Sequence, residues 1–145
     1  MSPTAPAANR LDPRTKNRYR VLIVDDEKTV LEVIHEMVVG QGYRCESTSS
    51  PIEALQRVKR DKFDALILDV YMPEMSGMLF HAKLRLVDPE LYKHTIFISG
   101  YVSLAELREH LSTSPAFLEK PFKARDLVEA IAKILPAAPR NAPAS

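Results

Sequence analysis

The sequence contains no tryptophan, four glycines and a single cysteine, Cys45. A lone cysteine excludes an internal disulfide and any zinc site built from several cysteines. The sequence also has no apolar run near the roughly 20 residues of a membrane-spanning helix, and no signal-peptide core follows Met1. We therefore expect a cytoplasmic protein that makes no contact with a membrane.

An excess of charge of one sign is also missing, because 20 Lys and Arg residues nearly balance 19 Asp and Glu residues. The formal net charge of +1 argues against a dedicated nucleic-acid surface, so we expect no direct DNA binding. Hydrophobic residues make up 46% and charged residues 27% of the chain, as in ordinary soluble globular proteins. Its 145 residues are enough to bury the core of one domain.

The two ends of the chain lack the periodic apolar pattern of helices and strands. Residues 1–18 and 136–145 are rich in proline and alanine instead. Such segments bury too little apolar surface to offset the entropy of ordering them. We therefore expect two flexible tails around one folded domain at residues 19–135.

Between these tails, short apolar runs alternate with amphipathic helical patterns. Continuously apolar runs such as ALILD at 65–69 are typical of strands buried on both faces. Strict alternation of strand and helix predicts an α/β fold, an open doubly wound domain in which helices cover both faces of a parallel sheet. The expected strands are 20–25, 43–48, 65–69, 95–99 and 116–120, and the expected helices are 29–39, 51–59, 78–86, 103–111 and 126–135.

Four of the expected strands end in charged or reactive side chains. In a parallel sheet, ligands bind at the carboxyl ends of the strands. One such residue alone is commonly a turn or capping residue, but four groups at the same edge indicate a site. They are Asp25 with Asp26 after the first strand, Asp69 after the third, Ser99 after the fourth and Lys120 after the fifth.

The three aspartates of this group, Asp25, Asp26 and Asp69, are expected to repel one another. One like-charge pair about 4 Å apart costs roughly 4 kcal/mol at an effective dielectric of about 20. Oxygen ligands without a nearby histidine or cysteine favour a hard cation such as Mg²⁺, which often lies beside a phosphate. On this reasoning, replacing Asp25 or Asp26 by Asn would stabilise the metal-free fold.

The remaining groups at this edge suit a phosphoryl ligand. Lys120 and the Ser99 hydroxyl would hold its oxygens, and Gly100 would allow its backbone N–H to approach closely. Asp69 lies centrally in the sheet and is the candidate nucleophile, because a carboxylate in this setting can form an acyl phosphate.

With these motifs in view, the chain resembles the receiver domain of bacterial two-component response regulators, from about Tyr19 to Leu135. The resemblance rests on VLIVDDE at 21–27, LILDVYMPEMSG at 66–77, TIFISG at 95–100 and FLEKPF at 117–122. It implies a flavodoxin-like (βα)5 fold with a five-stranded sheet in the order 2-1-3-4-5.

The resemblance also implies the chemistry of the site. Asp69 would accept a phosphoryl group from a histidine kinase or a histidine phosphotransfer protein. Mg²⁺ would be held by Asp25, Asp26, Asp69 and the main-chain carbonyl of Tyr71.

Further residues match the switch of the receiver family. Ser99 and Lys120 correspond to its phosphate-sensing hydroxyl and lysine, and Phe117 to its switch aromatic. The peptide bond between Lys120 and Pro121 is expected to be cis, a form open to proline at small cost. Read without the resemblance, Phe117 would simply be a core residue of a short strand.

Two tyrosines flank the expected acyl phosphate, since Tyr71 follows Asp69 by two residues and Tyr101 follows Ser99 by two. Our hypothesis is that both rings shield the phosphoryl group from the hydrolytic water. The alternative is that both rings point into solvent. The four histidines lack ligand spacing and are expected at the surface or at helix ends.

The resemblance covers the whole expected domain, so we expect no output domain on this chain and no turnover of a separate substrate. The output would be a surface. Inward movement of Ser99 and Phe117 would remodel the face made by the fourth helix, fifth strand and fifth helix, where a target protein or a second receiver would bind.

Three alternatives stay open at this point. The domain could be a phosphorelay intermediate or the receiver of a hybrid histidine kinase. An aspartate-nucleophile phosphatase of the haloacid dehalogenase type also uses a strand-ending Asp, but it needs a second Asp where this chain has Tyr71. A Rossmann-type nucleotide binder needs a glycine-rich turn where this chain has DDEK at 25–28.

Overall fold

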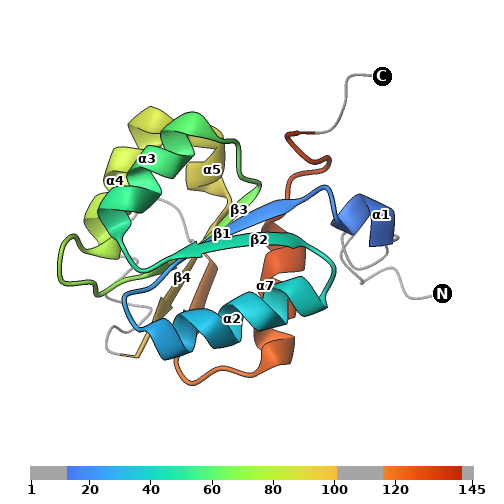
Figure 1. The fold of residues 1–145 in the computed structure, drawn as a ribbon, viewed down its shortest axis with the longest axis horizontal. Coiled ribbons are helices and arrows are strands. Elements are labelled where there is room, and N and C mark those ends of the chain that lie inside the picture. Colours follow the sequence, from blue (N-terminus) through green and yellow to red (C-terminus); the bar gives the residue numbers. More distant parts are fainter. Residues whose placement is uncertain (1–12, 101–115, 142–145) are drawn as a thin grey trace.

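A parallel sheet forms the centre of the computed structural model, which describes residues 13–100 and 116–141. Its strand order is β2-β1-β3-β4-β5, and every neighbouring pair is parallel. The doubly wound α/β fold and the strand order expected from the sequence are therefore confirmed (Figure 1). The strands are β1 (Arg20–Val24), β2 (Arg44–Thr48), β3 (Ala65–Asp69), β4 (Thr95–Ser99) and β5 (Ala116–Glu119).

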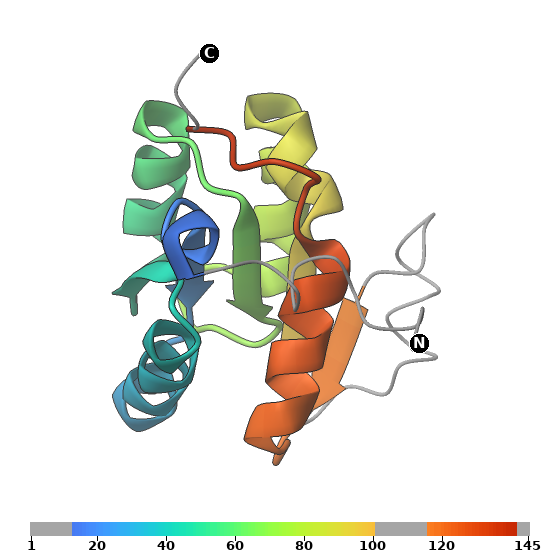
Figure 2. The same cartoon turned by 90° about the vertical axis from the view of Figure 1, so that its right-hand side faces the viewer.

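Helices cover both faces of this sheet, as Figures 1 and 2 show. One layer contains α2 (Lys28–Gly40) and α7 (Ala124–Ile134). The opposite layer contains α3 (Pro51–Arg60), α4 (Gly77–Val87) and the short α5 (Pro89–Lys93). A single turn, α1 (Pro13–Lys16), precedes β1. The helix expected at 103–111 lies outside the described residues.

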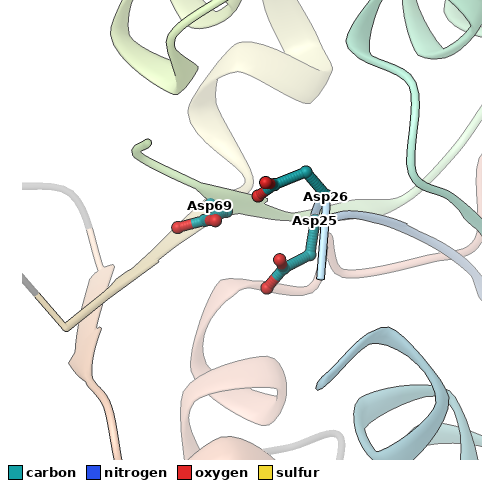
Figure 3. Close-up of side chains that lie close together, drawn as sticks. All are labelled: Asp25, Asp26 and Asp69. Atoms are coloured by element: carbon teal, nitrogen blue, oxygen red, sulfur yellow. The ribbon is translucent and has the colours of Figure 1, made fainter. Parts of the chain in front are cut away.

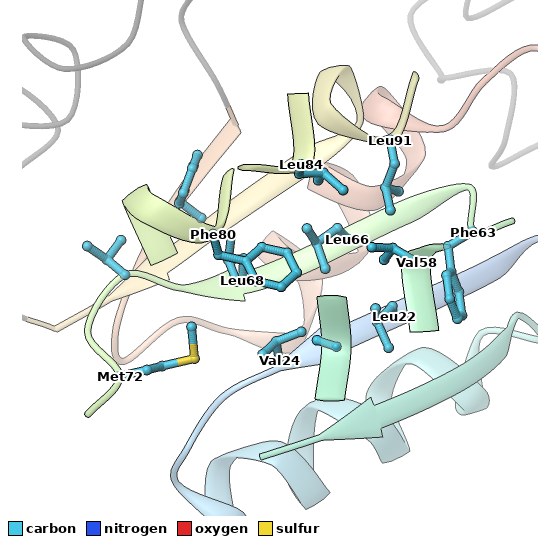
Figure 4. Packing of buried hydrophobic residues seen from close by; sticks show 13 residues of the cluster. Leu22, Val24, Val58, Phe63, Leu66, Leu68, Met72, Phe80, Leu84 and Leu91 are labelled. Carbon is cyan, nitrogen blue, oxygen red and sulfur yellow. The ribbon is translucent and has the colours of Figure 1, made fainter. Parts of the chain in front are cut away.

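The interiors of the central strands are apolar because their side chains alternate between two buried clusters. Leu22 and Val24 of β1 pack under α3 and α4, in the cluster that Figure 4 shows. Val21 and Ile23 of the same strand pack against α2 and α7. Both faces of β1 are buried, so a polar side chain can reach solvent or a ligand only where the strand ends.

Asp88 separates α4 from α5 and explains a helix that the sequence interpretation missed. The sequence predicts a helix at 78–86 and no second helix before the strand at 95–99. The Asp88 backbone N–H does donate to Leu84 and close α4, but its carboxylate then accepts a 3.2 Å hydrogen bond from the Leu91 N–H. Asp88 is thus also the N-cap of α5, with Pro89 in the first turn.

Part of the expected C-terminal tail, residues 136–141, is in contact with the folded domain. Residues 136–141 lie against the body of the domain: the Tyr19 hydroxyl donates to the Pro136 carbonyl at 2.9 Å, and the Asn141 amide donates to the Lys62 carbonyl at 2.8 Å. Local composition does not reveal contacts between residues so far apart in sequence. At the other end, α1 lies within the segment expected as a tail, while residues 1–12 and 142–145 are outside the described residues.

His81 is not at the surface, contrary to the expectation for the histidines. It is 3% exposed and stacks on the Tyr92 ring, while its Nε2 lies 2.9 Å from the Tyr92 carbonyl oxygen. Burial lowers the pKa of His81, although the Tyr92 carbonyl opposes this shift. His81 therefore behaves as a neutral part of the core.

In the part of the chain that the structure describes, we find no helix with both the length and the hydrophobicity that a membrane crossing requires.

Candidate functional site

Three aspartates meet at the carboxyl edge of the sheet (Figure 3). Asp25 and Asp26 follow β1 directly, and Asp69 is the last residue of the neighbouring strand β3. One carboxylate oxygen of each lies within 4.8 Å of the others. Asp25 is fully buried and Asp69 is 4% exposed, whereas Asp26 is half-buried. The clustering expected from the sequence is therefore present, and its oxygen-only donors suit a hard cation.

The Lys120 side chain reaches into the same acidic cluster. Its ammonium donates a 3.0 Å hydrogen bond to Asp25 and lies 3.8 Å from carboxylate oxygens of both Asp69 and Glu27. The backbone N–H of Lys120 donates to the Ser99 carbonyl at 2.8 Å, which anchors the residue beside β4. The sequence interpretation assigned Lys120 to the phosphate and missed this internal ion pair. The acidic cluster is thus partly neutralised by the protein itself.

This cluster shifts the pKa of Asp69 and the pKa of Lys120. Burial, followed by the charge of Asp25, raises the pKa of Asp69 to about 7, while Lys120 and the backbone N–H of Tyr71 oppose the shift. Burial alone would lower the pKa of Lys120. The hydrogen bond and charge of Asp25, together with Asp69 and Glu27, outweigh that effect, so the pKa of Lys120 is raised.

The other expected site residues take different positions around the cluster. Ser99 ends β4 with no exposure, and Gly100 beside it is exposed. Phe117 is partly buried and packs against the cluster under α3 and α4, so it fits both the core and the switch interpretation. Tyr71 is half exposed, and Tyr101 lies outside the described residues.

Glycine at the edge of the site is required at Gly77 rather than at Gly100. A Cβ at Gly100 would meet only the Lys120 Cβ, at an ordinary 3.7 Å. A Cβ at Gly77 would lie 2.2 Å from the Asp69 carbonyl oxygen and 2.9 Å from the Val70 Cα. The Gly77 N–H also donates to the Val70 carbonyl at 2.7 Å. Gly77 therefore lets the loop after β3 fold back tightly against Asp69.

An apolar groove of about 430 Å³ opens beside Lys120. It runs between α2 and the segment after β5, in which the peptide bond from Lys120 to Pro121 is cis, as expected. Its polar end carries Glu27, Gly100 and Lys120. The remaining lining residues are Thr29, Val30, Val33, Ile34, Met37, Pro121 and Phe122.

Comparison with known proteins places these features in a family. The family model described as "Response regulator receiver domain" matches residues 21–132. The response regulator MprA of Mycobacterium leprae is 32% identical over 117 residues, which cover 80% of this chain and 50% of MprA. The chain thus spans about half the length of this curated relative.

Other relatives match over nearly their full length. The response regulator receiver protein CpdR of Brucella abortus is 30% identical over 120 residues, covering 82% of this chain and 98% of CpdR. The chemotaxis protein CheY4 of Vibrio cholerae superposes with a TM-score of 0.74 at 25% identity, covering 81% of this chain and 98% of that structure. From the family match, the fold and the acidic edge together, this chain belongs to the response regulator receiver domains of two-component signalling.

Proposed function

We propose that the chain is a phosphorylation-dependent switch in which Asp69 is the phosphoacceptor. The observation that carries the proposal is the meeting of Asp25, Asp26 and Asp69 within 4.8 Å, with the Lys120 ammonium 3.8 Å from Asp69. A carboxylate oxygen of Asp69 attacks the phosphorus of a phosphohistidine. The new O–P bond replaces the N–P bond, and the histidine leaves with the electron pair and takes up a proton.

The acidic cluster fits Mg²⁺, because it offers several carboxylate oxygens and neither sulfur nor imidazole. Asp25, Asp26, Asp69 and the main-chain carbonyl of Tyr71 are the proposed ligands. When bound, Mg²⁺ would offset the negative charge that gathers around the transferred phosphoryl group.

The residues opposite the cation would hold the phosphoryl oxygens. Lys120 is already directed at Asp69 by its bond to Asp25, so a short movement brings its ammonium to the phosphoryl group. The Ser99 hydroxyl and the Gly100 N–H are the other proposed donors. A phosphoprotein would therefore draw Ser99 toward Asp69.

Two surfaces serve the partners of such a switch. A histidine kinase or histidine phosphotransfer protein must bring its histidine to Asp69, and the apolar groove beside Lys120 offers contact area for it. On the output side, we propose that movement of Ser99 and Phe117 remodels the face of β5, α7 and the segment between β4 and β5. A target protein or a second receiver would bind there, with no output domain required on this chain.

Incorporation of a phosphoryl group from acetyl phosphate and Mg²⁺, followed by intact mass, tests the proposal. We expect one phosphoryl group on the wild type and none on Asp69→Asn. Asp61→Asn, at the end of α3, is the matched control and should be labelled like the wild type. No label on the wild type, or equal label on Asp69→Asn, contradicts the proposal.

A second experiment separates the relay alternative. If the phosphorylated chain returns its phosphoryl group to a purified histidine phosphotransfer protein, the domain is a relay intermediate. Slow hydrolysis without return, together with binding of a target to the phosphorylated form, favours a terminal switch. Rapid turnover of a generic phosphomonoester would instead indicate a phosphatase.

A further inference from the structure

Two buried carboxylates face the C-terminal segment 136–141, here called the C-terminal arm, at the end of the sheet opposite the acidic site. Asp64 directly precedes β3 and has no exposure, and Asp88 between α4 and α5 is 4% exposed. Neither belongs to the phosphoacceptor site. Carboxylates buried this deeply require hydrogen bonds and a compensating charge.

Backbone N–H groups satisfy part of this requirement. Asp64 accepts from the Arg20 N–H at 2.7 Å and from the Arg140 N–H at 2.8 Å through its second oxygen. One oxygen of Asp88 accepts from the Leu91 N–H, at the start of α5. The other oxygen of Asp88 is left for a partner outside its own helix.

The guanidinium of Arg140 is the partner of this second Asp88 oxygen. Its Nη1 donates to the free oxygen of Asp88 at 2.8 Å and to the Phe63 carbonyl at 2.9 Å. The Arg140 side chain is 17% exposed, so the pair is largely shielded from water. Among the described residues, it is the one side-chain cation that forms an ion pair with Asp88.

A second arginine that acts on Asp64, Arg20, forms its ion pair with another carboxylate. The Arg20 guanidinium pairs with Glu46 and lies over the Phe63 ring, 4.8 Å from its centroid. Its charge stabilises ionised Asp64 from that position, as does the charge of Arg140. Burial is nevertheless the largest influence, and the pKa of Asp64 is raised. Loss of Arg140 would therefore leave Asp64 and Asp88 with too little positive charge.

The C-terminal arm has little else to hold it. It contains two prolines in PAAPRN and forms no helix or strand. Pro139 is buried, and apart from the bonds of Arg140 the arm has single hydrogen bonds from Tyr19 to the Pro136 carbonyl and from Asn141 to the Lys62 carbonyl. Figure 2 shows the arm crossing from the end of α7 toward α3.

We propose that Asp88 and the Phe63 carbonyl form a binding socket for an arginine guanidinium, that Arg140 is its built-in ligand, and that this residue, whose backbone N–H also binds Asp64, fastens the C-terminal arm to the domain. The arm is then a detachable part of the receiver. The socket takes a planar, weakly hydrated cation that remains charged at any relevant pH, which distinguishes it from a lysine site.

Release of the arm can be measured by limited trypsin digestion of the full chain, because trypsin cleaves after Arg140 when the arm is free. Asp88→Asn keeps an N-cap for α5 but removes the charge that holds Arg140. We expect cleavage after Arg140, followed by intact mass, to accelerate at least about tenfold relative to the wild type. The control Asp61→Asn should leave the rate unchanged. Equal rates in the wild type and Asp88→Asn would overturn the proposal.

Chemical rescue tests whether the socket is specific for guanidinium. Arg140→Ala should lower the unfolding midpoint by roughly 8 °C or more, whereas Arg125→Ala, at an exposed position of α7, should change it little. Millimolar methylguanidinium should restore part of the loss in Arg140→Ala, and methylammonium should not. Equal effects of the two ions, or equal midpoints of the two variants, would contradict a socket.

Should Arg140→Ala fail to fold, Arg140→Lys supplies the same comparison. Lysine retains the charge but lacks the planar group, so we expect a lower midpoint than in the wild type and faster trypsin cleavage after residue 140. A midpoint and a cleavage rate equal to those of the wild type would show that any cation serves. These outcomes do not depend on phosphorylation of Asp69, which can fail or succeed independently.

Discussion

The Lys120 ammonium donates a 3.0 Å hydrogen bond to Asp25, a carboxylate with no exposure to solvent. Asp25 also accepts a 2.9 Å hydrogen bond from the Glu27 N–H. The buried Asp25 carboxylate is therefore stabilised in the metal-free protein and does not require a bound cation. This relationship separates the roles of Asp25 and Asp26, which the sequence interpretation treated as equivalent.

The first prediction concerns this difference. Asp25→Asn removes one partner of a buried ion pair and should destabilise the metal-free fold by about 1–3 kcal/mol. Asp26→Asn removes a half-buried charge from an acidic cluster and should stabilise that fold by up to about 1 kcal/mol. Urea unfolding in the presence of a chelator measures both. A stabilised Asp25→Asn variant would restore the simple repulsion argument.

The second prediction is a pH dependence that arises from Asp69. Its pKa is about 7 in the folded protein, above the value of about 3.9 expected in the unfolded chain. Between these values the folded state binds more protons than the unfolded state. The free energy of unfolding of the metal-free protein should therefore fall as the pH rises from about 4 to about 7.

Urea unfolding at several pH values, with a chelator present, measures this slope. Asp69→Asn should flatten it in that window, whereas Glu74→Gln, at an exposed loop position, should retain it. A slope that survives in Asp69→Asn would assign the proton uptake to another group.

The third prediction compares two glycines. A Cβ at Gly77 would collide with the Asp69 carbonyl oxygen, so Gly77→Ala should destabilise the fold by about 1–3 kcal/mol and slow phosphorylation. A Cβ at Gly40 would meet nothing within 4 Å, so Gly40→Ala should be neutral or stabilise α2 by up to about 1 kcal/mol. Thermal unfolding and acetyl phosphate labelling measure both effects. Equal behaviour of the two variants would contradict the steric argument.

The fourth prediction tests the proposed shielding of the acyl phosphate. Tyr71 lies two residues after Asp69 and is 50% exposed, so its ring is at the surface close to the proposed phosphoryl group. Tyr71→Ala should accelerate autodephosphorylation about three- to tenfold, equivalent to roughly 1 kcal/mol of barrier. Tyr71→Phe should retain the wild-type rate. Tyr101→Ala supplies the same test for the second tyrosine, and unchanged rates in both Ala variants would refute the proposed shielding.

The strands and the acidic edge could be predicted because their signals are local. A continuously apolar run such as 65–69 indicates a buried strand, and the residue that follows it must lie at the carboxyl edge of a parallel sheet. The bond from Lys120 to Asp25 joins residues 95 positions apart, and no pattern in either segment specifies it. The burial of His81 was missed for the same reason, since it depends on Tyr92 and Phe97 in other elements.

Helix α5 and the contacts of the C-terminal arm were also absent from the sequence prediction. Proline after Asp88 is equally compatible with the end of one helix and the first turn of the next, and the choice depends on the Leu91 N–H reaching the Asp88 carboxylate. In the arm, a composition rich in proline and alanine predicts disorder. The arm is ordered only because buried hydrogen-bond acceptors in other parts of the chain bind it. Asp64 and Asp88 are such acceptors, but they are distant in sequence from Arg140.

Asp88 is difficult to replace because it makes three separate contacts. Its backbone N–H closes α4, one carboxylate oxygen opens α5 and the other holds Arg140. Asparagine preserves the helix start but loses the charge, and glutamate preserves the charge but places it one methylene too far out to cap. Neither asparagine nor glutamate makes both contacts, so a substitution at position 88 weakens either the start of α5 or the ion pair with Arg140.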